Sequence, residues 1–481
     1  MSSSSPPLVA PAPTTPRDAL RARRRDLMAR FPGPVLLAAG EAPARNYPAN
    51  VLPFRATSHF LYFVGEPIER AMLLFDEGRA TVFVDPPDAE DALWHGPRRS
   101  LEAWRERLGV EEVRPLAEVA ERVAAMSSRE RWPATLPPQD AHSAAKLSEI
   151  CARVVSPGGG ASLEVDRDAA LAEVVIGLRL RHDEAALAQL RFSAAVSVEA
   201  HRAGMGATRP GGSERDVYAA MVDVLRRRGC DDAYPPIVTV AGEVLHQRHH
   251  EGTTRAGDLL LADVGGESPE GWAADITRTW PVSGRFSATQ RAIYDIVLDA
   301  QRRAVARVTS GRRYREVHDT AKRALVEGLV GLGILRGEVD GLLERGAASL
   351  FFPHGVGHII GLDVHDMEDL GDRAGYAPGR ERSPRFGDAF LRLDRDLVPG
   401  MAVTVEPGFY QVPAILDDPR RTDAVGDDLR RDVLARFEDV RGIRIEDDVV
   451  VTTDGAPENL TAALPVEASA VEALVGHRRP A

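Results

Sequence analysis

Hydrophobic and polar positions in the first third of the chain form short apolar runs separated by amphipathic stretches. The apolar runs include "PVLLAA" (34–39), "FLYFVG" (60–65), "AMLLFD" (71–76) and "ATVFVD" (80–85). Amphipathic stretches such as "SLEAWRERLG" (100–109) have the periodicity of helices. Because strands that alternate with helices are typical of layered folds, we predict an α/β N-terminal domain over residues 18–165.

The segments around this domain have a different composition. Residues 155–166, "VSPGGGASLEVD", are Gly-rich and aperiodic, so we expect a linker there and a second domain over 166–481. The first 17 residues are rich in Ser, Pro and Ala, which favours a disordered tail without the features of a signal peptide. No window approaches the roughly 18 apolar residues of a membrane span, which favours a soluble protein without a membrane partner.

The second domain repeats its own pattern. Residues 208–229 and 308–333 each read as a glycine turn followed by an amphipathic helix that closes on glycine. The apolar strand in 256–266 aligns with the strand in 399–409, and the alignment pairs Gly257 with Gly400, Asp263 with Glu406 and Gly265 with Gly408. We therefore predict two related halves that face each other across a pseudo-two-fold axis.

Charge and cysteine content narrow the class of protein. The formal net charge is -12, which argues against nucleic acid or an anionic membrane as partner, since such surfaces bind clustered Lys and Arg. The two cysteines, Cys151 and Cys230, have no metal-ligand spacing and suggest no disulfide framework. This usage fits a reducing cytoplasm.

Four acidic residues stand at or beside apolar, β-branched runs, namely Asp263, Asp275, Glu406 and Glu446. An isolated buried carboxylate is strongly disfavoured, so a buried group of acids indicates bound cations. Residues 354–366, "HGVGHIIGLDVHD", add three histidines in a segment whose Val, Ile and Gly favour a strand or turn over a helix.

An oxygen-rich donor set with one imidazole suits divalent ions, most plausibly Mn²⁺, with Co²⁺ or Zn²⁺ as alternatives. Four carboxylates carry too much charge for one such ion, so two ions are favoured. Two ions roughly 3.5–4 Å apart hold a bridging hydroxide at neutral pH and stabilise a tetrahedral transition state. The chemistry that follows is hydrolysis.

Several motifs resemble those of the pita-bread metallopeptidases of the Xaa-Pro aminopeptidase and prolidase type. They are "FRATSHFLYFVGEP", "RLRHDEAALAQLRFSAAVSVEAH", "ADITRTWPVSGRF", "HGVGHIIGLDVHD", "VEPGFY" and "GIRIEDDVVVT". The resemblance covers the chain from about residue 45 onward. It implies an α+β pita-bread (creatinase/aminopeptidase-like) catalytic domain, hydrolysis of peptides with proline in second position, and a homo-oligomer.

The resemblance also implies roles for individual residues. The metal ligands would be Asp263, Asp275, His358, Glu406 and Glu446, with Asp275 and Glu446 bridging two ions. His246, His354 and His365 would line the pocket and stabilise charge on the scissile carbonyl, and Glu406 would shuttle a proton. Arg444, Tyr410 and Thr277 would orient the ligands from behind.

The sequence departs from this family pattern in two places. Asp263 and Asp275 are twelve positions apart where the family usually has eleven, and Gln247 and His250 replace a tyrosine and an asparagine. Two alternatives also stay open. One is a prolidase restricted to dipeptides, in which Arg392 of the long insertion 367–396 pairs with the free carboxylate. The other is of a different class, either a pita-bread module that binds proteins without catalysis or a relative that cleaves small amidino substrates without metal.

Overall fold

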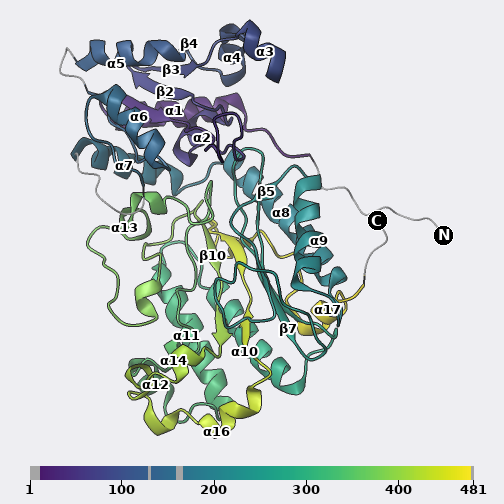
Figure 1. The fold of residues 1–481 in the computed structure, drawn as a ribbon. Helices are drawn as coiled ribbons and strands as arrows, with labels where there is room; N and C mark the ends of the chain where they lie inside the picture. Colours follow the sequence, from purple (N-terminus) through teal and green to yellow (C-terminus); the bar gives the residue numbers. More distant parts are fainter. Residues whose placement is uncertain (1–10, 128–131, 159–165, 478–481) are drawn as a thin grey trace. The chain divides into compact units, whose positions relative to one another are not determined.

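The computed structural model describes residues 11–127, 132–158 and 166–477, and these form two compact units (Figure 1). The N-terminal unit comprises Thr14–Ala186 and Met367–Ala374, and the C-terminal unit comprises residues 11–13, Leu187–Asp366 and the described residues from Gly375 onward. Residues 1–10 of the predicted tail and 159–165 of the predicted linker lie outside the described residues, so the domain limits stay a prediction. No helix within the described ranges has the length and apolar character needed to cross a membrane.

The N-terminal unit is built on one mixed sheet of order β1-β2-β3-β4, in which only β3 and β4 run parallel. Three of the predicted apolar runs form its first strands. Leu36, Leu74 and Phe83 project from them into a core shared with helices. The strands are β1 (Val35–Ala38), β2 (Met72–Asp76), β3 (Arg79–Val84) and β4 (Glu112–Pro115). The helices include α1 (Arg17–Arg30), α3 (Ala89–His95), α4 (Leu101–Leu108), α5 (Val119–Ser127), α6 (Ala141–Cys151) and α7 (Asp166–Arg179).

The remaining apolar run, "FLYFVG" (60–65), was expected to be a strand, and this prediction is wrong. It lies in helix α2 (Ser58–Val64), which Thr57 begins by accepting a bond from the Phe60 N–H. Gly65 ends the helix in the left-handed conformation, with φ of 78°. Every residue of α2 is buried. A helix without a polar face leaves no 3.6-residue periodicity in the sequence, and that is why the pattern misled.

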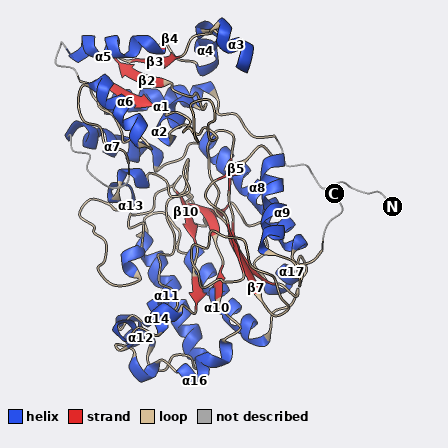
Figure 2. Ribbon diagram, viewed as in Figure 1, coloured by secondary structure: helices blue, strands red, loops and turns tan. Residues whose placement is uncertain are grey.

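In the C-terminal unit, helices pack against the strands, and Figure 2 distinguishes the two by colour. The long helices are α8 (Glu184–Ala207), α9 (Glu214–Arg227), α10 (Ala288–Val305) and α11 (Tyr314–Gly331), and shorter ones are α12 (Val339–Glu344), α14 (Pro413–Leu416), α15 (Pro419–Thr422), α16 (Arg431–Leu434) and α17 (Ala468–Glu472). A further short helix, α13 (Asp372–Gly375), belongs to the N-terminal unit except for its last residue. One sheet joins β6 (Ile237–Thr239), β7 (Leu259–Asp263) and β9 (Thr277–Pro281). Another joins β10 (Ala402–Val405), β13 (Asp447–Val450) and β14 (Glu458–Asn459). Two small pairs are β5 (Asp231–Asp232) with β8 (Gly266–Glu267), and β11 (Gly408–Tyr410) with β12 (Gly442–Arg444).

The predicted repeat recurs in local geometry. The turns before α9 and α11 each carry a left-handed glycine, Gly211 and Gly311, and both have φ of 81°. The turns before β7 and β10 carry Gly257 and Gly400, with φ of 94° and 89°. Isolated bridges join the helix start to the strand approach at the same place in each half, between Ser213 and Thr253 and between Arg313 and Asp396. Two copies of one helix and strand arrangement therefore build the C-terminal unit.

A glycine follows the strand-end acid in each half because the backbone is crowded there. A Cβ at Gly265 would lie 1.7 Å from the Ala274 carbonyl oxygen, and a Cβ at Gly408 would lie 2.4 Å from the Tyr410 hydroxyl. Real Cβ atoms do not approach so closely. The aligned glycines are thus required by close packing next to the acids.

We predict that Gly265→Ala lowers the free energy of unfolding of the C-terminal unit by about 3 kcal/mol or more, because the new methyl overpacks the β7–β9 hairpin. Urea unfolding of the full chain measures this. Gly341→Ala is the matched control, since no atom lies within 4 Å of a Cβ there. That helical position should lose no stability and should gain up to about 1 kcal/mol. An unchanged unfolding midpoint for Gly265→Ala would contradict the argument from crowding.

Candidate active site

The histidine-rich segment 354–366 is extended where it passes β10, as the sequence predicted. Ile359 forms an isolated antiparallel bridge with the strand. The Thr404 N–H donates to the His358 carbonyl at 3.0 Å, and the Glu406 N–H donates to the Val356 carbonyl at 2.8 Å. This pairing brings the side chains of His358 and Glu406 to the same end of β10.

The β7–β9 hairpin places two of the acids on one face. Asp263, the last residue of β7, is directly opposite Thr277, the first residue of β9. Asp275 lies two residues before Thr277 and is therefore the diagonal neighbour of Asp263 on the same face. The spacing of twelve residues is thus compatible with a shared site, because the register puts both carboxylates on that face.

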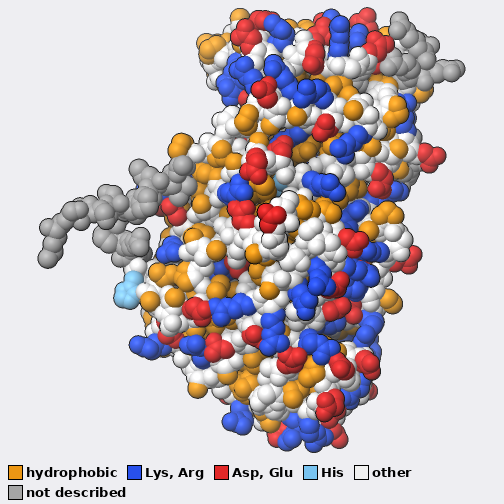
Figure 3. All heavy atoms as spheres, turned by 180° about the vertical axis from the view of Figure 1, so that it is seen from behind, with side chains coloured by type: hydrophobic (Ala, Val, Ile, Leu, Met, Phe, Trp, Pro, Cys, Tyr) orange, Lys and Arg blue, Asp and Glu red, His pale blue; other side chains and the backbone are white. Residues whose placement is uncertain are grey.

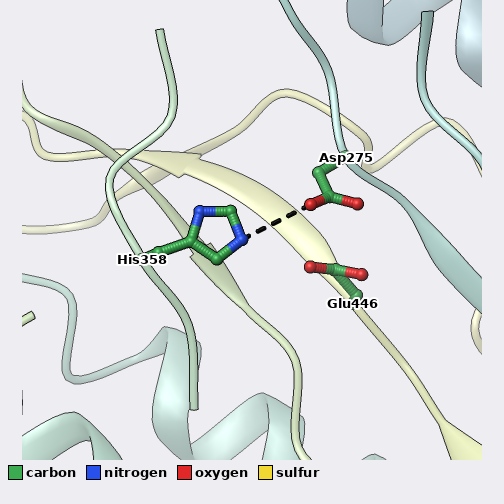
Figure 4. A group of neighbouring side chains, drawn as sticks. All are labelled: Asp275, His358 and Glu446. Carbon is green, nitrogen blue, oxygen red and sulfur yellow. Dashed lines mark ion pairs between the residues drawn. The ribbon is translucent and has the colours of Figure 1, made fainter. Parts of the chain in front are cut away.

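Asp275, His358 and Glu446 form a buried group whose ligand atoms all lie within 4.8 Å of one another (Figure 4). His358 Nε2 is 3.4 Å from Asp275 Oδ2 and 3.7 Å from Glu406 Oε1. His358 Nδ1 donates to the Ile359 carbonyl at 3.1 Å. Since a carbonyl only accepts, this bond holds the tautomer whose Nε2 can coordinate a cation.

Asp263 and Glu406 lie beside this group, but they are not among the three residues whose ligand atoms are all within 4.8 Å of one another. Tyr234 connects two of the acids, because its hydroxyl lies 2.6 Å from Asp263 Oδ1 and 2.6 Å from Asp275 Oδ1. The sequence analysis missed Tyr234, which shares no spacing with the acids. Its only signal is the pairing of β6 with β7, in which Ile237 opposes Asp263 and brings the preceding residues to the same sheet end.

The Arg444 guanidinium joins the residues that were expected to orient the ligands. It donates to Asp263 Oδ2 at 2.5 Å, to Thr277 Oγ1 at 2.9 Å and to the Tyr410 hydroxyl at 3.0 Å. Thr277 in turn donates to Glu446 Oε2 at 2.6 Å. The structure therefore brings Arg444, Thr277 and Tyr410 together behind two of the acids, and their catalytic role stays a prediction.

Burial and the repulsion of neighbouring carboxylates oppose ionisation of Glu446, Glu406 and Asp263. Burial raises the pKa of Glu446 well above its usual value, and the negative charges of Asp275, Glu406 and Asp263 raise it further. Burial likewise raises the pKa of Glu406 to about 7 and that of Asp263 to about 6, although neighbouring positive charges act in the opposite direction. Buried carboxylates in this number are stable as anions only beside cations. The donor set of carboxylates and one imidazole fits a divalent metal ion.

Two histidines of the segment lie beside the ligand candidates. His354 Nδ1 donates to the Gly355 carbonyl at 2.8 Å, so its Nε2 accepts from the Tyr410 hydroxyl at 2.9 Å. Burial lowers the pKa of His354 to about 3 and keeps the ring neutral. The His365 ring centroid is 4.3 Å from that of His358. Burial, together with the charges of His358 and Arg392, lowers the pKa of His365 to about 2.

A cavity of about 790 Å³ opens onto these residues. His246 and Arg392, both predicted to contact substrate, also line it. Gln247 and His250 are not among its lining residues. The His250 ring stacks on Tyr218 at 4.2 Å, and its Nε2 lies 3.1 Å from the Pro236 carbonyl oxygen. Gln247 and His250, the two departures from the family pattern in this stretch, therefore do not line the cavity.

Comparison with known proteins agrees with this geometry. The family described as metallopeptidase family M24 matches residues 188–453, and the aminopeptidase P, N-terminal domain family matches residues 20–132. A probable Xaa-Pro aminopeptidase of Paracoccidioides brasiliensis is 36% identical over 425 residues, which span 86% of each chain. The Xaa-Pro dipeptidase of Homo sapiens is 33% identical over 431 residues, which span 88% of this chain and 84% of the relative.

Solved structures with similar folds include aminopeptidase P of E. coli with the inhibitor Pro-Leu, which has a TM-score of 0.77 at 29% identity over 95% of this chain and 98% of the other. Aminopeptidase PepP of Pseudomonas aeruginosa has a TM-score of 0.75 at 29% identity over the same shares. These matches confirm the predicted fold class, an α/β N-terminal domain followed by a pita-bread catalytic domain. With more than half of its residues matched by one family, the chain belongs to metallopeptidase family M24 and carries an aminopeptidase P-type N-terminal domain.

Proposed function

We propose that this protein is a metal-dependent Xaa-Pro aminopeptidase, which hydrolyses the bond between an N-terminal residue and a following proline. The observation that carries the proposal is the buried group of Asp275, His358 and Glu446 at a cavity large enough for a peptide end. Relatives named Xaa-Pro aminopeptidase and Xaa-Pro dipeptidase support the same chemistry. A non-catalytic binding module is disfavoured because all five ligand positions hold side chains that can bind a metal.

The proposed site holds two divalent ions, with Mn²⁺ as the first choice and Co²⁺ or Zn²⁺ as alternatives. Their ligands would be Asp263, Asp275, His358, Glu406 and Glu446. Such ions supply Lewis acidity and lower the pKa of water. The high carboxylate count favours two ions over one, since each ion neutralises two negative charges.

The protein's own residues supply orientation and proton transfer in this proposal. Glu406 lines the cavity beside the proposed ions and would accept and return the proton of the attacking water. His354, His365 and His246 line the cavity and would orient the substrate and stabilise negative charge on its carbonyl oxygen. Arg444 would keep Asp263 in place and, through Thr277, Glu446 as well.

A prolidase restricted to dipeptides is the second candidate, and the position of Arg392 favours it. Arg392 lines the same cavity as His246 and His365. Its positive charge contributes to lowering the pKa of both histidines, after the larger effect of burial, which indicates that the three groups lie near one another. A guanidinium there would pair with the free carboxylate of an Xaa-Pro dipeptide.

We further propose a cytoplasmic protein that works as a homo-oligomer and has peptides as its partners. Two buried free cysteines support the reducing compartment. The net charge of -12 supports the expectation that nucleic acid is not a partner. On the face drawn in Figure 3, Lys and Arg side chains are interspersed with Asp and Glu rather than gathered into one basic surface.

Metal removal tests the metallopeptidase assignment. Chelation should abolish hydrolysis of an Xaa-Pro peptide, and added Mn²⁺ should restore it. His358→Ala should weaken metal binding by more than about 100-fold in titration calorimetry, since residues behind the ligands already contribute about 10–100-fold. His250→Ala removes a histidine outside the cavity and should bind metal normally. Full activity after chelation would exclude the metal mechanism.

Substrate selectivity tests the requirement for proline. The bond before proline has no N–H, so a site adapted to it must hold the ring by shape. We expect kcat/KM for an Xaa-Pro substrate to exceed that for the matching Xaa-Ala substrate by more than about 100-fold, or about 2.7 kcal/mol of transition-state stabilisation. Similar kcat/KM values for the pair would contradict the proposed specificity.

Arg392→Ala separates the two candidate functions. We expect it to reduce kcat/KM for Xaa-Pro dipeptides by more than about tenfold, equivalent to about 1.4 kcal/mol, and to leave longer peptides nearly unaffected. Arg336→Ala is the control, because this arginine pairs with Asp428 and does not line the cavity. Equal losses on both substrates, or no loss on either, would favour the plain aminopeptidase.

A further inference from the structure

The insertion between His358 and Glu406 brings two aromatic rings to the cavity. Phe386 and Phe390 both line it, with ring centroids 6.3 Å apart in an edge-to-face arrangement. Phe390 is 53% exposed, which is unusual for so large an apolar side chain. Val412 and Ile415 also line the cavity and extend its apolar surface. We call residues 386–392 the aromatic segment.

A buried ion pair fixes the middle of the aromatic segment. Asp388 is 8% exposed and accepts hydrogen bonds from the Lys322 ammonium and, at 3.3 Å, from His318 Nε2. Both donors lie on α11 and are buried. Burial alone would raise the pKa of Asp388, but His318 and Lys322 lower it well below its usual value, so the carboxylate stays charged. Loss of one partner would leave the other charge buried, which destabilises the local structure.

The backbone of the aromatic segment is also held closely on both sides. Gly387 has φ of 83°, and a Cβ there would lie 2.2 Å from Ser349 Oγ. A Cβ at Gly355, within the histidine-rich segment, would lie 2.7 Å from Leu391 Cα. The Tyr376 hydroxyl donates to the Leu391 carbonyl at 2.7 Å. The backbone on both sides of the half-exposed Phe390 ring is therefore held by close packing and a hydrogen bond.

We propose that Phe386 and Phe390 select the N-terminal residue of the substrate by contact with its side chain, and that Asp388 is the positioning residue for them. The inference rests on the proposed Xaa-Pro hydrolysis. In an Xaa-Pro substrate the proline ring is constant and only Xaa varies. A large apolar Xaa side chain would cover the exposed Phe390 ring, and removal of that apolar surface from water favours binding. The enzyme should accordingly prefer Leu, Met or Phe over Gly in the first position.

Kinetics with Phe-Pro, Leu-Pro and Gly-Pro test the specificity role. Phe390→Ala should lower kcat/KM for Phe-Pro and Leu-Pro by about tenfold or more, mainly through KM, while Gly-Pro changes by less than about threefold. Phe386→Ala should shift the ratio in the same direction. Phe286→Ala is the matched control, because Phe286 is also partly buried but packs on Tyr294 and does not line the cavity.

Two further variants test the positioning role of Asp388. Asp388→Asn should reduce the preference for Phe-Pro over Gly-Pro by about fivefold or more, with bound metal unchanged, since its side chain does not line the cavity. Combining Asp388→Asn with Lys322→Gln removes both buried charges and leaves a neutral hydrogen-bonding pair, which should restore the preference. A purely structural role predicts equal losses on all three substrates and no rescue of selectivity.

The outcomes separate the two proposals. If the wild-type protein cleaves no Xaa-Pro substrate, the proposed function fails, and the inference fails with it. If it cleaves them but Phe390→Ala lowers kcat/KM equally for Phe-Pro and Gly-Pro, or for neither, only the aromatic segment's role in selection is overturned.

Discussion

The repulsion among buried carboxylates is the constraint on which the catalytic half of this protein depends. Asp263, Asp275, Glu406 and Glu446 all line one cavity, and burial makes each of their charges costly. The fold lowers that cost by placing hydrogen-bond donors beside the carboxylates. Arg444 donates a hydrogen bond to Asp263, and the Tyr234 hydroxyl lies between Asp263 and Asp275, at hydrogen-bond distance from both. In the proposed site, divalent cations would neutralise the negative charge that remains.

The duplicated architecture provides the rigidity that such a cluster needs. Each half ends a strand in an acid, Asp263 on β7 and Glu406 directly after β10. Each acid is followed by a proline or valine and then by a glycine whose missing Cβ permits close approach of neighbouring atoms. Because sheet register fixes side-chain direction, hairpins hold carboxylates in position better than flexible loops would. The two related strand ends therefore hold Asp263 and Glu406 in fixed positions at one cavity.

The sequence predicted those features that repeat locally or carry a motif. The two helix and strand repeats, the extended histidine-rich segment and the candidate ligands around His358 could all be found from residue spacing or from family resemblance. Helix α2 could not, because its residues are all buried and a helix that is buried on every side has no periodic signal. Tyr234 was missed since its place beside Asp263 results from strand pairing. Asp388 was missed for a related reason, as its partner Lys322 is 66 residues away along the chain.

In the proposed enzyme, substrate specificity can arise in a part of the fold that is separate from the acid cluster. Residues that contact the acids are constrained by charge, so a change at Arg444 disturbs Asp263, Thr277 and Tyr410 together. The insertion between His358 and Glu406 contributes no candidate ligand, yet Phe390 and Arg392 bring it to the cavity. Its attachment to α11 through Asp388 is separate from the acid cluster. If Phe390 and Arg392 contact substrate as proposed, substrate preference can change through the insertion while Arg444, Thr277 and Tyr234 keep their bonds to the acids.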